Sequence, residues 1–335
     1  MLRVATWRAA LSRNGPGLLL HELRTAPSDQ ARAAVAVIAA LQADVLLLTD
    51  VDYDPGLAAL DALAGLLEAA GSDYPHRMAL RPNAGVATGF DLDGDGRLGR
   101  AEDAQGWGRF PGDGGMAILS RLPFDTAATR DHSGFLWRDL PAARGPVAAT
   151  EDGRAVQRLA SRGAWDVAVE VPGGGVLRVL AFHAAPPLAA AADRDLRRNH
   201  DEVAFWTHLL DGVLPLPAPE PPFVLMGIAN ADPADGLGDA AALRRLLAHP
   251  ALRDPIPRGG HGRQEPDHQG DPALDTALVG SEGAERGLRL DFVLPSAGLE
   301  VRASGVMWPE ATDPLLQVLT TAGRHRPVWV EIALP

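Results

Sequence analysis

Nine apolar runs rich in Val, Leu and Ile recur along the chain, and turn-forming residues separate them. Runs of this length and composition predict β-strands that are buried on one or both faces. The runs are LRVATW, DVLLLTDV, GMAILS, WDVAVEV, VLRVLAFHA, PFVLMGIAN, LDFVLPS, ASGVMW and RPVWVEIAL.

Four other segments have the apolar spacing of helices. They are Asp29 to Gln42, Gly56 to Ala70, Asp193 to Asp211 and Asp239 to His249. Ser28 or Asp29 would cap the first helix and Gly71 would end the second. Helices early in the chain, strand pairs in the middle and strands again at the end indicate a mixed α/β fold.

Two stretches have the composition of loops: Arg81 to Gly115, rich in Gly and Asp, and the polar, Gly-rich Pro255 to Arg286. The Pro-rich segment LPLPAPEPP is too short to separate domains, and no internal repeat occurs. A chain of 335 residues has room for one large core. We therefore predict a single domain over residues 1–335, with an insertion at about residues 81–115.

Composition excludes several chemistries. The chain has no cysteine, and all 31 of its basic residues are arginine, so thiol nucleophiles, cysteine metal sites, lysine Schiff bases and P-loop lysines are ruled out. The net charge of −12, without a dense basic run, disfavours duplex nucleic acid as a partner. No run has the length of a transmembrane segment, and the start of the chain lacks the pattern of a signal peptide.

The insertion contains DLDGDGRLGRAE, which has the ligand pattern of an EF-hand calcium loop. Asp91, Asp93, Asp95 and Glu102 are the expected side-chain ligands of Ca²⁺, and Arg97 would contribute its carbonyl. The alternative is an acidic, Gly-rich turn that binds no ion. Glycines on both sides oppose flanking helices, so the predicted role is to order the insertion and not to act as a calcium sensor. Such a site favours a periplasmic or secreted setting, where calcium is abundant.

Polar side chains stand near the ends of five predicted strands: Asp50, His183, Asn230, Asp291 and His325. Active sites of α/β sheets collect at strand ends, because the sheet fixes the positions and the loops give access. Acidic and amide oxygens suit a hard divalent cation that acts on a phosphoester, with histidine as an acid or as an electrostatic stabiliser.

Each of these residues also has a structural alternative. A strand histidine is often a hydrogen-bonded structural residue, and Asn230 with Asp232 would serve as turn residues before Pro233. Asp291 would then cap a strand. Asp50, together with Asp52 and Asp54, would form a solvated loop before a helix N-terminus. Arg8, after the first strand, would be a surface residue or would place its own charge in a metal pocket.

The order of the segments RVATW, DVLLLTDV, GMAILSRLPF, LAFHA, GIANADP, LDFVLPS and RHRPV resembles the endonuclease/exonuclease/phosphatase family over nearly the whole chain. The resemblance implies a four-layer α/β/β/α sandwich with two packed mixed β-sheets. The family includes deoxyribonuclease I-like enzymes, sugar and lipid phosphatases and sphingomyelinases. The chain is most similar to a bacterial branch of the family marked by RPNAGVATG, DLDGDG, RRNHDE and DPALDT.

The resemblance also implies roles for individual residues. His183, Asn230, Asp291 and His325 match catalytic positions, with His325 near the scissile phosphate. Asp50 stands where the family has a metal-binding glutamate, and would hold a catalytic Mg²⁺ or Mn²⁺.

Three positions depart from the family pattern. Arg8 replaces an asparagine, Ile228 replaces the aspartate of G-D-x-N, and Arg324 replaces the aspartate of S-D-H that orients the histidine. Two hypotheses follow. The first is a metal-dependent phosphoester hydrolase acting on a small or exposed phosphoester. The alternative is a catalytically impaired calcium-binding protein on the same fold. The sequence indicates neither a specific substrate nor an oligomeric state.

Overall fold

The chain folds around two mixed β-sheets, as described by a computed structural model over residues 1–187, 192–236, 238–281 and 283–334. The strands are β1 (Leu2–Leu11), β2 (Val45–Val51), β3 (His76–Met78), β4 (Gly115–Ser120), β5 (Phe124–Asp131), β6 (Ala164–Val171), β7 (Gly175–His183), β8 (Phe223–Ile228), β9 (Ala277–Val279), β10 (Arg286–Leu288), β11 (Asp291–Pro295), β12 (Glu300–Val306) and β13 (Val328–Ala333). One sheet has the order β12-β13-β1-β2-β4-β3, the other β11-β8-β7-β6-β5, and β9 pairs with β10 in a separate ribbon.

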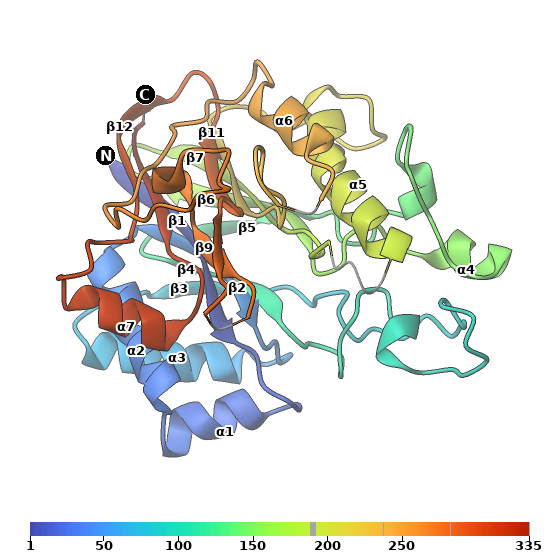
Figure 1. The fold of residues 1–335 in the computed structure, drawn as a ribbon, viewed down its shortest axis with the longest axis horizontal. Coiled ribbons are helices and arrows are strands. Elements are labelled where there is room, and N and C mark those ends of the chain that lie inside the picture. The colour runs from blue at the N-terminus through green and yellow to red at the C-terminus, as the bar shows by residue number, and fades with distance from the viewer. Residues whose placement is uncertain (188–191, 237, 282, 335) are drawn as a thin grey trace.

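Helices cover the outer face of each sheet. The helices of the described residues are α1 (Leu18–Thr25), α2 (Asp29–Leu41), α3 (Ala58–Ala69), α4 (Glu151–Val156), α5 (Ala192–Leu210), α6 (Ala241–Leu247) and α7 (Leu315–Ala322). Helices α1, α2, α3 and α7 lie together on one side of the molecule, and α5 and α6 lie on the other (Figure 1). This arrangement is the α/β/β/α sandwich, so the predicted fold class is confirmed.

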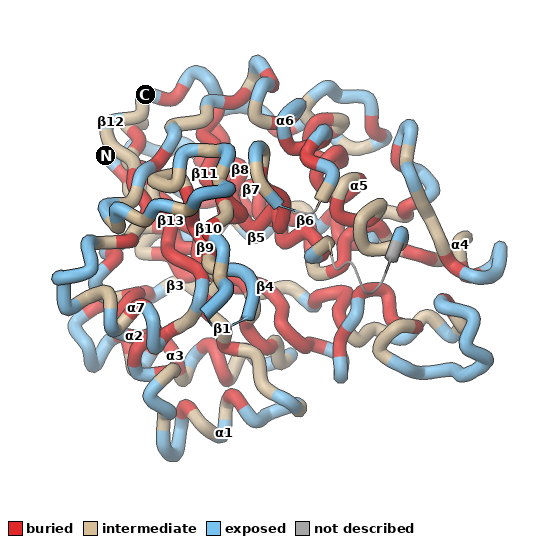
Figure 2. The backbone as a smooth tube through the Cα atoms, viewed as in Figure 1, coloured by how far each residue is buried: buried red, intermediate tan, exposed pale blue. Residues whose placement is uncertain are grey.

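The alternation of side chains along the strands produces the layers. In β2, Leu46 and Leu48 pack with the helices on the outer face, whereas Val45 and Leu47 pack between the sheets. Both sheets are buried along most of their length, and exposed backbone is concentrated in helices and loops (Figure 2). An apolar cluster shared by the two sheets therefore fixes their relative position.

Each of the nine predicted strands corresponds to an observed strand, and each of the four predicted helices to an observed helix, with ends shifted by a few residues. The Ser28 hydroxyl accepts a hydrogen bond from the Ala31 N–H at 3.2 Å, so the predicted cap of α2 is confirmed. The sequence did not predict the short strands β3, β5, β9 and β10 or the helices α1, α4 and α7. These elements have three to eight residues, too few for a clear period, and β5 is also mostly polar.

The predicted insertion between β3 and β4 is an ordered loop. It contains a 3₁₀ helix at Ala101–Asp103 and two isolated bridges, Ala84 to Gly106 and Ala87 to Ala104. The Asn83 amide ties it to the second sheet region by donating to the carbonyls of Ser133 and Ala160, each at 2.7 Å. The stretch Pro255 to Arg286, predicted as a loop, also contains β9 and a 3₁₀ helix at Pro272–Leu274.

The organisation of residues 1–335 as one domain stays a prediction. Among the described residues, no helix combines the length and the apolarity needed to cross a membrane.

Candidate active site

His325 and Asp291 form a hydrogen-bonded pair that joins the two sheets. His325 precedes β13 of the first sheet, and Asp291 begins β11 of the second. The His325 Nδ1 atom lies 2.8 Å from Asp291 Oδ2, and a carboxylate can only accept, so Nδ1 carries the proton. The backbone of His325 is held in turn, because its carbonyl accepts from Trp7 Nε1 of β1 at 3.1 Å.

Thr276 fixes the carboxylate of this pair. Its hydroxyl donates to Asp291 Oδ2 at 2.8 Å and accepts from the backbone N–H groups of Leu290 and Asp291 at 2.9 and 3.1 Å. Asp291 is wholly buried. The resemblance had assigned the orientation of the histidine to the residue before it, but Arg324 is exposed and Asp291 performs that role.

His183 ends β7, beside the end of β8. The two strands are parallel, and the register sets His183 opposite Ile228, which in turn lies opposite Asp291 of β11. Ile228 is wholly buried, so an apolar side chain separates the two polar positions. Burial, with the positive charges of Arg162 and Arg8, holds the pKa of His183 well below its ordinary value, so this imidazole is neutral at pH 7.

Asn230 lies just beyond β8 with a left-handed backbone (φ 49°), a conformation that asparagine tolerates better than most residues. Its Nδ2 donates to the Ala184 carbonyl at 2.7 Å. The amide therefore ties the end of β8 to the end of β7. This contact agrees with the structural alternative for Asn230 and leaves its carbonyl oxygen as the atom for any further role.

A bulge in β2 places Asp50 beside Arg8. Asp50 has φ 60°, and the pairing of β2 with β4 shifts between Thr49 and Val51. Val51 packs with the helix-side cluster although Val45 and Leu47 face the other sheet, so the bulge reverses the alternation. Arg8 Nε donates to Asp50 Oδ2 at 3.0 Å.

The other acidic residues near this end of the sheets serve local structure. Asp52 accepts from the N–H groups of Arg13 and Gly114, and Asp54 accepts from the first N–H groups of α3. Asp232 accepts from the N–H groups of the turn that follows it and from the Arg289 N–H. Asp232 therefore does not replace the aspartate that is missing at Ile228.

Two pockets open at this end of the molecule. One has a volume of about 380 Å³ and is lined by Arg8, Asp50, Arg324 and His325 together with β9. The other, of about 300 Å³, is lined by residues from β7, α5 and the insertion, namely His183, Arg162, Arg194, Arg198, Glu102, Trp107 and their neighbours. The predicted site residues His183, Asp50 and His325 thus border pockets. Asn230 and Asp291 line neither of these pockets, and they hold neighbouring groups in place.

Asp50 is not part of a cluster of side chains that could coordinate a divalent cation within the described residues. Within the described ranges, the only cluster of three or more Asp, Glu or His ligand atoms lying within 4.8 Å of one another is in the insertion. The Asp50 carboxylate already contacts a guanidinium, and the position of the missing aspartate is apolar. This set of side chains does not fit the catalytic Mg²⁺ or Mn²⁺ that the resemblance implies.

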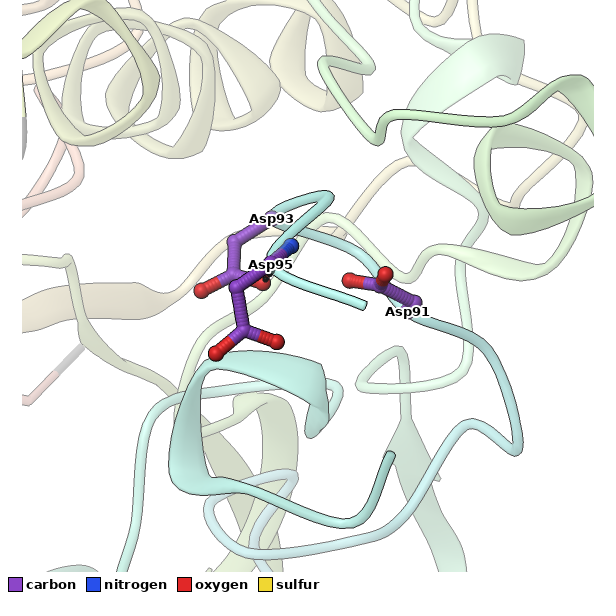
Figure 3. Close-up of side chains that lie close together, drawn as sticks. All are labelled: Asp91, Asp93 and Asp95. Carbon is purple, nitrogen blue, oxygen red and sulfur yellow. Dashed lines mark hydrogen bonds between the residues drawn. The ribbon is translucent and has the colours of Figure 1, made fainter. Parts of the chain in front are cut away.

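The cluster in the insertion consists of Asp91, Asp93 and Asp95, whose carboxylates gather at one side of the loop (Figure 3). Asp91 accepts from the N–H groups of Gly94 and Gly96 at 2.7 and 2.8 Å, which shapes the turn. Glu102 lies outside the cluster, and its Oε1 accepts from Trp107 Nε1 at 3.1 Å. The structure confirms that no α-helix flanks the loop. Calcium binding by these residues and by Arg97 stays a prediction.

Four residues of the site were not identified from the sequence. Arg162 lines the pocket beside His183, and Thr276 holds Asp291. Asn199 donates to the carbonyls of Ala185 and Ala229, and Glu202 accepts from the N–H groups of Ser161 and Ala185. The polar run RRNHDE on an otherwise amphipathic helix was the available signal for Asn199 and Glu202. Thr276 ends the segment DPALDT, which was the available signal for it, and no local pattern distinguishes Arg162.

The chain was compared with protein-family models and with known proteins, and a family match covers most of its length. A model of the endonuclease/exonuclease/phosphatase family matches residues 14–322, so the chain belongs to that family. No curated protein sequence matches the chain.

Solved structures share the fold at low sequence identity. A family member from Beutenbergia cavernae is 21% identical with a TM-score of 0.56, covering 99% of this chain and 71% of its own. Sphingomyelinase C from Streptomyces griseocarneus is 21% identical with a TM-score of 0.52, covering 99% of both chains. A mannosyl-6-phosphatase from Bacteroides thetaiotaomicron is 12% identical with a TM-score of 0.54, covering 100% of both.

Proposed function

We propose that the chain is a phosphoester hydrolase that acts on a small or exposed phosphoester. The observation that carries the proposal is the His325–Asp291 pair at the wall of a pocket of about 380 Å³. Family membership supports it, as do similar structures named as a mannosyl-6-phosphatase and a sphingomyelinase C. The net charge of −12 favours small substrates over duplex nucleic acid.

In the proposed reaction, a water oxygen attacks phosphorus while His325 accepts the proton of that water at Nε2. The phosphorus–oxygen bond to the leaving group breaks, and the leaving oxygen takes a proton from solvent. Asp291 holds the ring through Nδ1 and stabilises the imidazolium that forms. His183 stays neutral, because its pKa is lowered by burial and by Arg162 and Arg8, so it would hydrogen-bond a phosphoryl oxygen without adding charge.

A catalytic Mg²⁺ or Mn²⁺ at Asp50 stays a prediction that the Arg8 contact does not favour. No step of the proposed reaction passes through a cation. Calcium in the insertion is a separate proposal, supported by the grouping of Asp91, Asp93 and Asp95. Its role would be structural, because it lies outside the pocket that His325 lines.

The second candidate function is a catalytically impaired calcium-binding protein. The observation that favours it is Ile228, which is wholly buried where the family pattern has an aspartate. An isoleucine neither accepts a proton nor orients water, and loss of one member of a cooperating set removes most of the catalysis of the set.

Turnover separates the two candidates. The purified chain is assayed with p-nitrophenyl phosphate and bis-p-nitrophenyl phosphate, in EDTA and with Mg²⁺, Mn²⁺ or Ca²⁺. Hydrolysis that disappears in His325→Ala and persists in His21→Ala, an exposed control on α1, supports the hydrolase. Absence of turnover by the parent chain under all these conditions refutes it and supports the impaired protein.

A further inference from the structure

Arg162 is a partly buried cationic side chain that forms no salt bridge with the described residues. Its Nη1 donates to the Trp107 carbonyl at 2.6 Å, while its Nε is fully buried and has no hydrogen-bond partner in the described part of the chain. No carboxylate oxygen of the described residues lies within 4.0 Å of it. Burial lowers the pKa of Arg162, against the opposing effect of the carboxylates of Asp50, Asp113 and Glu202. A partly buried guanidinium with unused N–H donors is suited to bind an anionic ligand.

Two buried arginines, Arg198 and Arg326, donate to several backbone carbonyls, although the Nε of Arg326 has no partner among the described residues either. Arg198 donates to the carbonyls of Leu159, Gln105 and Arg158, and the guanidinium of Arg326 donates to carbonyls at the end of α7 and stacks on Trp308. Arg162 has one such carbonyl. Arg162 combines a place on the wall of a pocket with a single carbonyl acceptor, so its guanidinium keeps N–H donors for a ligand.

Arg8 supplies a second guanidinium. Its Nε is committed to Asp50, but neither Nη atom has a hydrogen-bond partner among the described residues, and 37% of the side chain is exposed. It lines the same pocket as His325. Because the pleat of β1 sets Arg8 on the face of Val4, which packs between the sheets, it is directed toward the second sheet and its histidine.

Arg8 and Arg162 line different pockets, and both lie near the Asp50 carboxylate. A Cβ atom added to Gly114 would lie 3.0 Å from Asp50 Oδ1 and 3.8 Å from Arg162 Nε, so the Asp50 carboxylate and the Arg162 guanidinium both border this glycine. The charges of Arg162 and Arg8 both act on His183. Asp50 offsets one of the two positive charges, and the exposed Arg324 adds another beside His325.

We propose that Arg8 and Arg162 bind the phosphoryl oxygens of a phosphate monoester, in place of a divalent cation. The inference rests on the proposed function and deepens it by assigning the substrate class. Guanidinium groups present paired N–H donors that match the oxygens of a phosphate. A phosphomonoester offers two negative charges and three free oxygens, whereas a diester offers one charge and two. The arginine charges belong to the chain, so binding does not require a metal.

The test measures binding of inorganic phosphate by calorimetry in excess EDTA. The parent chain should bind, and Arg8→Gln and Arg162→Gln should each weaken binding about 10- to 100-fold, as expected for loss of a charged hydrogen bond. Arg24→Gln, an exposed position on α1, is the matched control and should bind as the parent does. Absence of binding in EDTA, or equal affinity in the parent and Arg162→Gln, overturns the proposal.

Thermal unfolding distinguishes a ligand-binding arginine from a structural one. In phosphate-free buffer, Arg162→Gln should unfold at about the temperature of the parent, because Arg162 makes no salt bridge and a single hydrogen bond among the described residues. Phosphate should raise the unfolding temperature of the parent and not of the variant. A lower unfolding temperature of the variant, with an unchanged response to phosphate, contradicts the proposal.

The hydrolase proposal and the arginine-site proposal can be refuted independently of each other. Phosphate binding in EDTA without turnover of any ester supports the arginine site and refutes the hydrolase. Turnover and phosphate binding that both require Mg²⁺ or Mn²⁺ support the hydrolase and overturn the arginine site.

Discussion

Arg8 Nε donates to Asp50 Oδ2 at 3.0 Å, and this contact engages the carboxylate that the family resemblance assigns to a divalent cation. A partly exposed ion pair of this kind contributes only about 0–1 kcal/mol to stability. Its importance is therefore electrostatic: it holds a fixed positive charge at the place where a cation would otherwise bind.

Replacement of Arg8 by asparagine should create affinity for a divalent cation. The change frees the Asp50 carboxylate and adds an amide oxygen, which is a suitable ligand for Mg²⁺ or Mn²⁺. We expect the apparent affinity for Mn²⁺ to rise about tenfold or more in a calorimetric titration. Arg24→Gln should leave it unchanged, and equal affinities in the parent and Arg8→Asn would argue against the role of the ion pair.

Replacement of Asp291 by asparagine should lower kcat for an accepted phosphoester about 10²- to 10⁴-fold. The amide keeps the size of the side chain but cannot stabilise a positive imidazole at the distance of 2.8 Å. Steady-state kinetics should show the loss in kcat with little change in KM. A rate close to that of the parent would remove His325 from the proposed reaction.

Thr276→Val should destabilise the fold and lower activity together. The substitution deletes the donor to Asp291 Oδ2 and leaves the N–H groups of Leu290 and Asp291 without their acceptor. Unmet buried hydrogen bonds of this kind cost about 1–3 kcal/mol. Urea unfolding measures the change, and Thr276→Ser, which keeps the hydroxyl, should remain close to the parent. Equal stability of the valine and serine variants would contradict the assignment.

His183 should make the stability of the chain depend on pH. Its folded pKa is depressed by burial, Arg162, Arg8 and His325, so below its ordinary value of 6.5 the unfolded chain takes up a proton that the folded chain refuses. Stability should therefore be full above that value and fall at lower pH, by at most about 1.4 kcal/mol per pH unit for this site.

Urea unfolding at neutral and at mildly acidic pH checks this expectation in the parent and in His183→Gln. The variant should lose less stability on acidification. His132 has a pKa that burial shifts in the same direction, so His132→Gln is the matched comparison. Identical pH dependence in the parent and His183→Gln would show that the imidazole of His183 is not held neutral.

Calcium should bind the insertion through Asp91. Calorimetric titration of the parent is expected to give a dissociation constant of about 10⁻⁴ to 10⁻³ M, in the range of extracellular modules. Asp91→Ala should abolish the binding, because its carboxylate belongs to the cluster with Asp93 and Asp95. Asp73→Ala, an exposed aspartate outside the loop, is the control. Unchanged binding in Asp91→Ala would refute the calcium assignment.

The sequence predicted the strands that have continuous apolar runs and missed the three-residue strands and the polar β5, for a physical reason. A strand such as β8 is buried along its whole length, and its apolar run identifies it without reference to neighbours. By contrast, β9 has three residues, and its pairing with β10 depends on contacts that no local pattern records.

The residues of the candidate site also fall into those that the sequence predicted and those that it did not. His183 and His325 stand at strand ends and follow the order of family segments, so they were found. Arg162 and Thr276 act through partners far away in sequence, such as Trp107 and Asp291, and only the folded chain brings these residues together. The role of Asp50 was also obscured, because its direction depends on a bulge that strand periodicity does not predict.

The hydrogen bond between His325 and Asp291 crosses from one sheet to the other. Its length is consequently set by the thickness of the apolar layer between the sheets, where residues such as Val4, Leu47 and Met226 meet. Substitutions that swell or thin this layer would shift the reaction geometry from a distance. The residues that would carry out the reaction thus differ from the residues that set the distance between His325 and Asp291. The apolar layer can change in sequence while the histidine and the aspartate are kept.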